Sequence, residues 1–182
     1  GFPPSMYAGY QLIGFEGMNE DQERQFARDQ YDSKVRMAIS YYNESDWDDA
    51  LKTFEQALLM AKKQGDTESI NVLYNYIITC AAYGDFYDEA ISYQLDVIDN
   101  ATANRDFSGI ADGYNNLVHF YTEKKDFDRA VFYQNEYLKL AEQHGLRIEM
   151  ATSYRNIGLV YERGGQYENS VAYFSKAIES FT

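Results

Sequence analysis

The side chains most able to support catalysis or to hold a metal are few in this sequence. The chain of 182 residues contains two histidines, His119 and His144, and one cysteine, Cys80. They stand at no metal-ligand spacing, and no glycine-rich phosphate loop or nucleophile elbow accompanies them. We interpret Cys80 as a buried, inert filler and the acidic pair Asp48-Asp49 as charges at a helix start. We therefore expect no catalytic residue, no metal site and no cofactor.

Asparagine is the residue type whose spacing suggests a binding chemistry. Asn75 and Asn115 are 40 residues apart, and so are Asn116 and Asn156. A carboxamide offers both a donor and an acceptor, so a ladder of asparagines could hold the N–H and C=O groups of an extended peptide without reading its side chains. The alternative interpretation is that asparagine on a solvated helix face is simply polar.

The same interval organises the rest of the chain. Residues 154–177 contain two apolar helix faces separated by a Gly164-Gly165 turn, because apolar or small residues recur there at helical spacing. These residues are Tyr154, Ile157, Gly158, Tyr161, Ser170, Phe174 and Ala177. An aromatic residue opens each expected second helix, at Trp47, Tyr87, Phe127 and Tyr167. The pattern predicts four repeats, at about 31–64, 71–104, 111–144 and 151–182.

This pattern resembles the tetratricopeptide repeat, whose first helix carries an aromatic, a large apolar, a small residue and a tyrosine, and whose second carries Ala, Phe and Ala. The resemblance implies an all-α, right-handed α-solenoid of four helix-turn-helix repeats over residues 19–182, with first helices lining a concave surface. Gly65 and Gly145 are expected to end helices in the left-handed conformation. Residues 1–18 fit no helix period and are expected to form an irregular arm or a disordered leader, after which Asn19 can cap a helix.

Positions beside the buried stripe of each first helix are the expected partner-binding residues. They are Asn75, Thr79, Asn115, Asn116, His119, Arg155, Asn156 and Leu159. The asparagine-bearing helices are similar to those of kinesin light chains, Pins-type spindle adaptors and bacterial Rap and PlcR-type pheromone receptors, which implies a module that holds an extended peptide. The two-carboxylate clamp of Hsp70 and Hsp90 co-chaperones is disfavoured, because Val35 and Ile39 stand where that clamp needs Lys and Asn.

The charge of the chain limits its partners. A net charge of −13 repels phosphate backbones and anionic lipids, so nucleic acid and membrane surfaces are poor candidates. No apolar run is long enough to predict membrane insertion, and we expect a soluble, cytoplasmic protein. The sequence favours a scaffold, adaptor or sensor with a protein or peptide partner. The alternatives are a self-assembly module and a regulatory part of a larger signalling protein.

The last predicted helix has an unusual apolar stripe. Val171, Phe174, Ile178 and Phe181 fall at helical spacing on one face, whereas a solenoid normally ends in a polar-faced helix. Exposing a few hundred Å² of such surface forgoes on the order of 5–10 kcal/mol. We expect this face to be covered, either in a homo-oligomer or by further residues of a longer chain.

Overall fold

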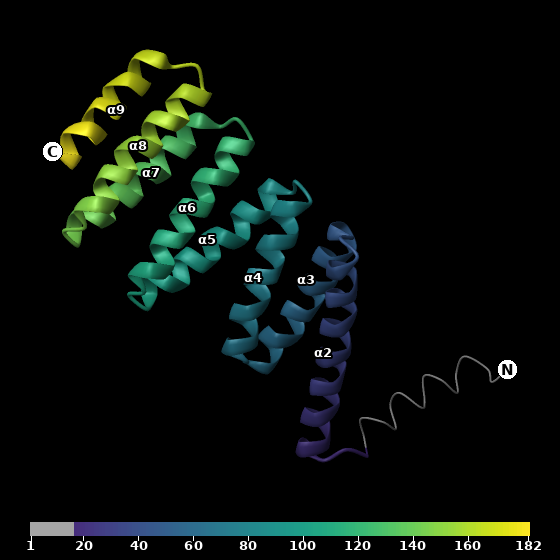
Figure 1. The fold of residues 1–182 in the computed structure, drawn as a ribbon. Coiled ribbons are helices and arrows are strands. Elements are labelled where there is room, and N and C mark those ends of the chain that lie inside the picture. Colours follow the sequence, from purple (N-terminus) through teal and green to yellow (C-terminus); the bar gives the residue numbers. More distant parts are fainter. Residues whose placement is uncertain (1–16) are drawn as a thin grey trace. The chain divides into compact units, whose positions relative to one another are not determined.

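The computed structural model describes residues 17–182, and over this range the chain forms eight α-helices and no strand (Figure 1). The helices are α2 (Glu20–Asn43), α3 (Trp47–Gln64), α4 (Thr67–Tyr83), α5 (Tyr87–Ala103), α6 (Phe107–Glu123), α7 (Phe127–Gln143), α8 (Arg147–Arg163) and α9 (Tyr167–Phe181). The prediction of an all-α repeat solenoid is confirmed. Residues 1–16, which include most of the predicted arm, lie outside the described residues.

The helices belong to two compact units, one ending at Tyr76 and the other beginning at Ile77 within α4. In the first unit α2 packs against α3, and the ring of Tyr76 stacks on Phe54 with centroids 4.8 Å apart. In the second unit α5 packs on α6, α6 on α7, α7 on α8 and α8 on α9. Each helix of this unit therefore contacts its neighbours in sequence, as expected for stacked helix hairpins.

Turns of two or three residues join the helices, and each contains one residue with a positive φ. These residues recur every 20 positions, at Ser45, Gly65, Asp85, Arg105, Lys125, Gly145 and Gly165. Each donates its N–H to the carbonyl three residues back, and the next residue donates to the carbonyl five residues back; the N–H groups of Lys125 and Asp126, for example, both bond at 2.9 Å. This arrangement is the Schellman motif, which satisfies the last carbonyls of a helix. The left-handed stops predicted at Gly65 and Gly145 are confirmed.

Several helices are capped at their start by an aspartate that follows the left-handed residue. Asp126 accepts a hydrogen bond from the backbone N–H of Arg129 at 3.3 Å, which caps α7, and Asp106 caps α6 in the same way. Asn19 caps α2 in a reciprocal capping box with Gln22, as predicted. The four aromatic residues expected to open second helices are the first residues of α3, α5, α7 and α9.

Tyrosines from both helices of a hairpin form the centre of the last two repeats. Tyr133 of α7 stacks on Tyr121 of α6 at a centroid distance of 5.6 Å and lies 6.1 Å from Tyr114. The same arrangement recurs around Tyr173 of α9, whose ring lies 5.5 and 6.5 Å from two tyrosines of α8. Burial raises the pKa of Tyr114 and Tyr133. These phenols therefore stay protonated well above neutral pH.

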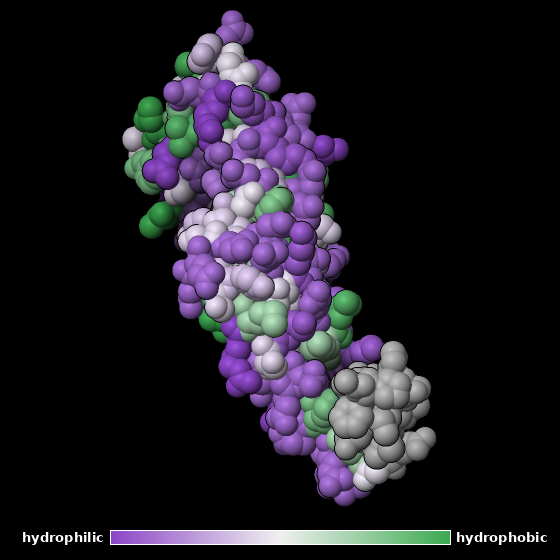
Figure 2. All heavy atoms as spheres, turned by 90° about the vertical axis from the view of Figure 1, so that its right-hand side faces the viewer, coloured by the Kyte–Doolittle hydropathy of each residue, from purple (hydrophilic) through white to green (hydrophobic). Residues whose placement is uncertain are grey.

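The outer surface of the helices is largely polar. The face of the molecule in Figure 2 is mainly hydrophilic, with hydrophobic side chains in small separate groups. This distribution agrees with the net charge of −13. No helix within residues 17–182 is long and apolar enough to cross a bilayer.

Candidate functional site

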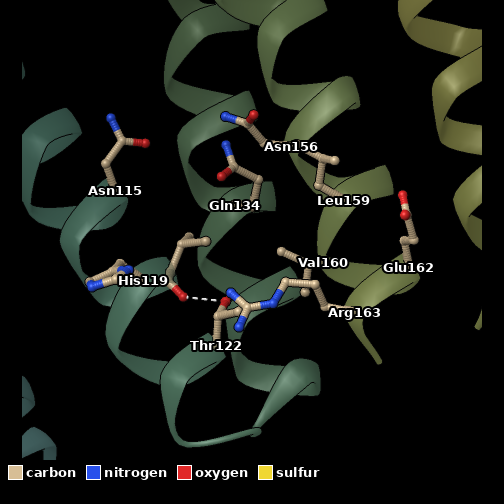
Figure 3. Close-up of a pocket in the computed structure, with 10 residues that line it drawn as sticks. Asn115, His119, Thr122, Gln134, Asn156, Leu159, Val160, Glu162 and Arg163 are labelled. Carbon is tan, nitrogen blue, oxygen red and sulfur yellow. Dashed lines mark hydrogen bonds between the residues drawn. The ribbon is translucent and has the colours of Figure 1, made fainter. Parts of the chain in front are cut away.

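A hollow of about 530 Å³ opens in the second unit between α6 and α8, the first helices of the last two repeats (Figure 3). We call it the α6–α8 hollow. α6 contributes Asn115, Val118, His119 and Thr122; α8 contributes Asn156, Leu159, Val160, Glu162 and Arg163; and α7 contributes Gln134. Because α7 packs against both of these helices, the side chain of Gln134 reaches the floor between them. The hollow thus combines a few apolar walls with several amide groups.

Gln134 is the buried polar group of this hollow. The side chain is 1% exposed, and its Nε2 has no hydrogen-bond partner among the described residues. Its carboxamide points from α7 toward that of Asn156 (Figure 3). An amide donor buried without a partner costs about 1–3 kcal/mol. The free protein therefore tolerates an unmet hydrogen bond at the floor of the hollow.

The equivalent glutamine one repeat earlier has its carboxamide oxygen hydrogen-bonded within the protein. Gln94 of α5 is also buried, and its Oε1 accepts a hydrogen bond from Asn116 Nδ2 at 3.0 Å. Gln94 and Gln134 occupy the column that holds Phe54 in the first repeat and Phe174 in the last. The fold therefore accepts an apolar ring at this position.

The rim of the hollow is electrostatically mixed. Arg163 Nη1 lies 3.5 Å from a carboxylate oxygen of Glu123, on the preceding first helix. Glu162 adds a further carboxylate to the rim. The one guanidinium of the lining set is thus shared with an acidic neighbour, and the hollow has no excess of positive charge to attract an anion.

Four of the eight predicted partner-binding residues meet at this hollow: Asn115, His119, Asn156 and Leu159. Of these, Asn115 also hydrogen-bonds the phenol of Tyr137, which opposes the rise in the pKa of Tyr137 that burial and nearby carboxylates cause. Leu159 is 45% exposed and forms part of the wall.

The other four predicted residues lie elsewhere. Asn116 is exposed but its amide group is engaged by Gln94, so it supports the packing of α5 against α6. Arg155 is exposed on α8 and does not line the hollow. Asn75 and Thr79 lie on α4, and each has an interaction within the protein. The hollow therefore does not gather both asparagine columns.

The sequence interpretation missed Gln134, Thr122, Val118, Val160, Glu162 and Arg163 as lining residues. A signal for Gln134 was present, because two glutamines replace phenylalanine in one apolar column. A polar residue in a buried column is more informative than a polar residue on an exposed face.

The four residues of the apolar stripe predicted on the last helix differ in how exposed they are. Val171, Ile178 and Phe181 are 63%, 67% and 65% exposed. Phe174 is only partly exposed and lies against Gly158 of α8, where a Cβ atom would stand 2.8 Å from its ring. Phe174 therefore belongs to the packing of the last hairpin, whereas Val171, Ile178 and Phe181 present apolar surface to solvent.

Groups suited to catalysis are dispersed or buried. Cys80 is 0% exposed, and desolvation raises the pKa of its thiol to about 11, as expected for an inert buried cysteine. His144 lies against Phe107 with ring centroids 4.1 Å apart, away from the lining of the hollow. Within residues 17–182, no three His, Cys, Asp or Glu side chains are grouped to hold a metal ion.

Comparison with known proteins agrees with the helix-hairpin architecture. A family model described as tetratricopeptide repeat matches residues 109–182, and another with the same description matches residues 35–68. The uncharacterized protein ycf37 of Cyanophora paradoxa is 35% identical over 66 residues, which are 36% of this chain and 37% of that protein.

Among solved structures, BtubC (BKLC) from P. vanneervenii is similar with a TM-score of 0.61 and 19% identity, over 82% of this chain and 62% of that chain. A MamA protein is similar with a TM-score of 0.45 and 20% identity, over 82% of this chain and 91% of that chain. The chain thus spans 37% of the curated relative and 62% of BtubC.

Proposed function

The chain belongs to the tetratricopeptide repeat superfamily, and we propose that it is a non-catalytic adaptor or sensor that holds an extended peptide across α6 and α8. A protein-interaction or scaffold role is what this fold supports in general. The finer proposal rests on one observation, the meeting of Asn115 and Asn156 at a hollow between two successive first helices.

The chemistry of these two residues supports a backbone-directed grip. Each carboxamide has donor and acceptor atoms, and each lies on a different first helix, so together they could bond peptide groups along an extended segment. Leu159 and Val118 offer apolar contact for an intervening side chain. Asn116 is left out of this grip because it does not line the hollow, and its amide group donates to Gln94 instead.

The test uses a peptide selected from a phage library of random dodecapeptides and then synthesised. We expect Asn115→Ala with Asn156→Ala to weaken its binding by about 2 kcal/mol, at about 1 kcal/mol for each lost hydrogen bond, while the melting temperature changes little. Calorimetric titration measures the affinity. Asn169→Ala makes the same chemical change on α9, away from the hollow, and should leave the affinity unchanged. Equal binding by the double variant and the wild type would refute the asparagine grip.

Self-association is a second candidate function, and a separate observation favours it. Val171, Ile178 and Phe181 project largely exposed from α9. Apolar surface of this kind is more common at interfaces than on monomers. The two functions are compatible, because the α6–α8 hollow has no lining residue on α9.

A further inference from the structure

Gln134 is a polar residue where the repeat can accommodate a phenylalanine. The corresponding positions in the first and last repeats are Phe54, which is fully buried, and Phe174. An apolar side chain at position 134 would remove an unsatisfied buried donor, so the glutamine costs stability in the free protein. A side chain that is costly to folding and forms the floor of a hollow points to a role in binding.

We propose that Gln134 is a specificity-determining residue of the α6–α8 hollow, and that its Nε2 donates a hydrogen bond to an amide carbonyl oxygen of the bound partner. This inference rests on the proposed peptide-binding function and adds to it the chemical group that must reach the floor. The carbonyl can come from the peptide backbone or from an Asn or Gln side chain of the partner.

The preceding repeat shows what a completed pair looks like. Asn116 donates to Gln94 at 3.0 Å, so this carboxamide pair is closed by the protein itself. Asn156 and Gln134 stand one repeat later at the same two positions, yet Gln134 Nε2 bonds neither Asn156 nor any other described residue. The open pair lies at the hollow that Gln134 lines, and because Nε2 itself is covered, its carboxamide must turn toward the hollow to reach an acceptor on a ligand.

Charge favours a neutral acceptor over a carboxylate. Glu162 lines the hollow, and Arg163 is already paired with Glu123 at 3.5 Å. A ligand carboxylate on the floor would be desolvated in an acidic protein of net charge −13 without a free cation among the lining residues. An amide carbonyl avoids this cost and still accepts one hydrogen bond from Gln134.

The main experiment compares Gln134→Met with Gln94→Met. Methionine keeps a similar length and volume without a donor or acceptor. We expect Gln134→Met to raise the melting temperature by roughly 2–4 °C, because the substitution removes a buried donor that has no hydrogen-bond partner. The same variant should bind the phage-selected dodecapeptide about tenfold more weakly, which corresponds to about 1.4 kcal/mol.

Gln94→Met is the matched control because it leaves Asn116 without its partner. It should lower the melting temperature and leave peptide affinity within about twofold, since its carboxamide is not part of the hollow. If Gln134→Met is destabilised as Gln94→Met is, then Asn156 accepts from Gln134 in solution and the proposal is wrong. Unchanged peptide affinity in Gln134→Met overturns it as well.

A measurement on the wild-type chain avoids any effect of mutation. The side-chain NH₂ resonances of Gln134 can be followed by ¹⁵N NMR during titration with the same peptide. A downfield shift of one Nε2 proton is expected when a carbonyl accepts from it, and resonances that stay in place at saturation contradict the proposal.

Variants of the peptide identify the source of the carbonyl. Replacing backbone amides by esters weakens the acceptor one position at a time, and replacing each Asn or Gln by Ala removes side-chain carbonyls. Substitution at one position should reduce affinity for the wild type but not for Gln134→Met. If neither series contains such a position, the proposal is wrong. Failure to select any binding peptide overturns the proposed function too, whereas binding insensitive to Gln134→Met overturns this inference alone.

Discussion

Four of the seven turn residues with positive φ are not glycine, and each of these four lowers the stability of the fold through local backbone strain. Lys125 has φ 63°, a conformation that costs a residue with a Cβ atom roughly 1 kcal/mol. We expect Lys125→Gly to raise the free energy of unfolding by about 0.5–1 kcal/mol, because glycine adopts this conformation without a steric penalty. Urea denaturation of the two proteins measures the change.

Gly145 provides the matched control in the reverse direction. It has φ 65°, and a Cβ atom added there would meet nothing within 4 Å. Gly145→Ala should therefore destabilise by about 1 kcal/mol through backbone strain alone. If both substitutions leave the urea midpoint in place, the left-handed turns do not limit stability.

The turn residues also show which left-handed positions could be predicted from the sequence. Gly65 and Gly145 indicate their left-handed turns because glycine is strongly favoured there. Arg105 and Lys125 adopt the same conformation, but their residue types do not indicate it. Only the 20-residue interval between turns reveals these positions, since helices of nearly equal length must end at equal spacing.

At the scale of helices, the close approach of α8 and α9 depends on the absence of a side chain at Gly158. A Cβ atom there would lie 2.8 and 2.9 Å from two ring carbons of Phe174. Helix propensity alone favours alanine by about 0.5–1 kcal/mol, whereas overpacking costs about 1–3 kcal/mol. We expect the clash to outweigh the propensity, so that Gly158→Ala lowers the melting temperature.

A double-mutant cycle tests this packing. Phe174→Leu shortens the opposing side chain, so the double variant should be less destabilised than the sum of the two single variants by about 1 kcal/mol. Simple additivity would place the cost of Gly158→Ala somewhere other than the α8–α9 contact.

The pairing of helices into hairpins was easier to predict from the sequence than the hydrogen bonds made by polar side chains on the helix faces. The aromatic residues that open α3, α5, α7 and α9 recur once per repeat, because hairpin packing imposes the same requirement each time. The asparagines do not behave as one set, because Asn116 is bound by Gln94 while Asn156 leaves Gln134 open. Side-chain pairing across helices depends on atomic geometry that residue spacing does not contain.

At the scale of the whole molecule, stability depends on contacts between neighbouring hairpins. Surface ion pairs join neighbouring hairpins in the second unit: Asp88 of α5 pairs with Lys124, which follows α6, and Glu123 of α6 pairs with Arg163 of α8. Exposed pairs of this kind contribute roughly 0–1 kcal/mol each. Buried side chains such as Leu117 and Ile157 therefore provide most of the stability of the contacts between hairpins. A helix with an uncovered apolar face lacks part of this stabilisation.

α9 has such a face, and the last prediction concerns what covers it. Val171, Ile178 and Phe181 are each about two-thirds exposed. Covering a few hundred Å² of apolar surface is worth on the order of 5–10 kcal/mol before the cost of association, which consumes several kcal/mol. We expect the chain to form a weak dimer through α9 at high concentration, measurable by light scattering.

Charged substitutions on the two sides of α9 separate this interface from a general effect of charge. Val171→Glu with Ile178→Glu should abolish the dimer, because two carboxylates would be buried without partners. Asn169→Glu with Ala172→Glu adds the same charge to exposed positions on another side of the helix and should leave the dimer intact. Phe174 is unsuitable for this test, since it packs on Gly158 within the last hairpin. A wild-type chain that stays monomeric at millimolar concentration would show that exposed apolar residues on α9 are tolerated without a second copy.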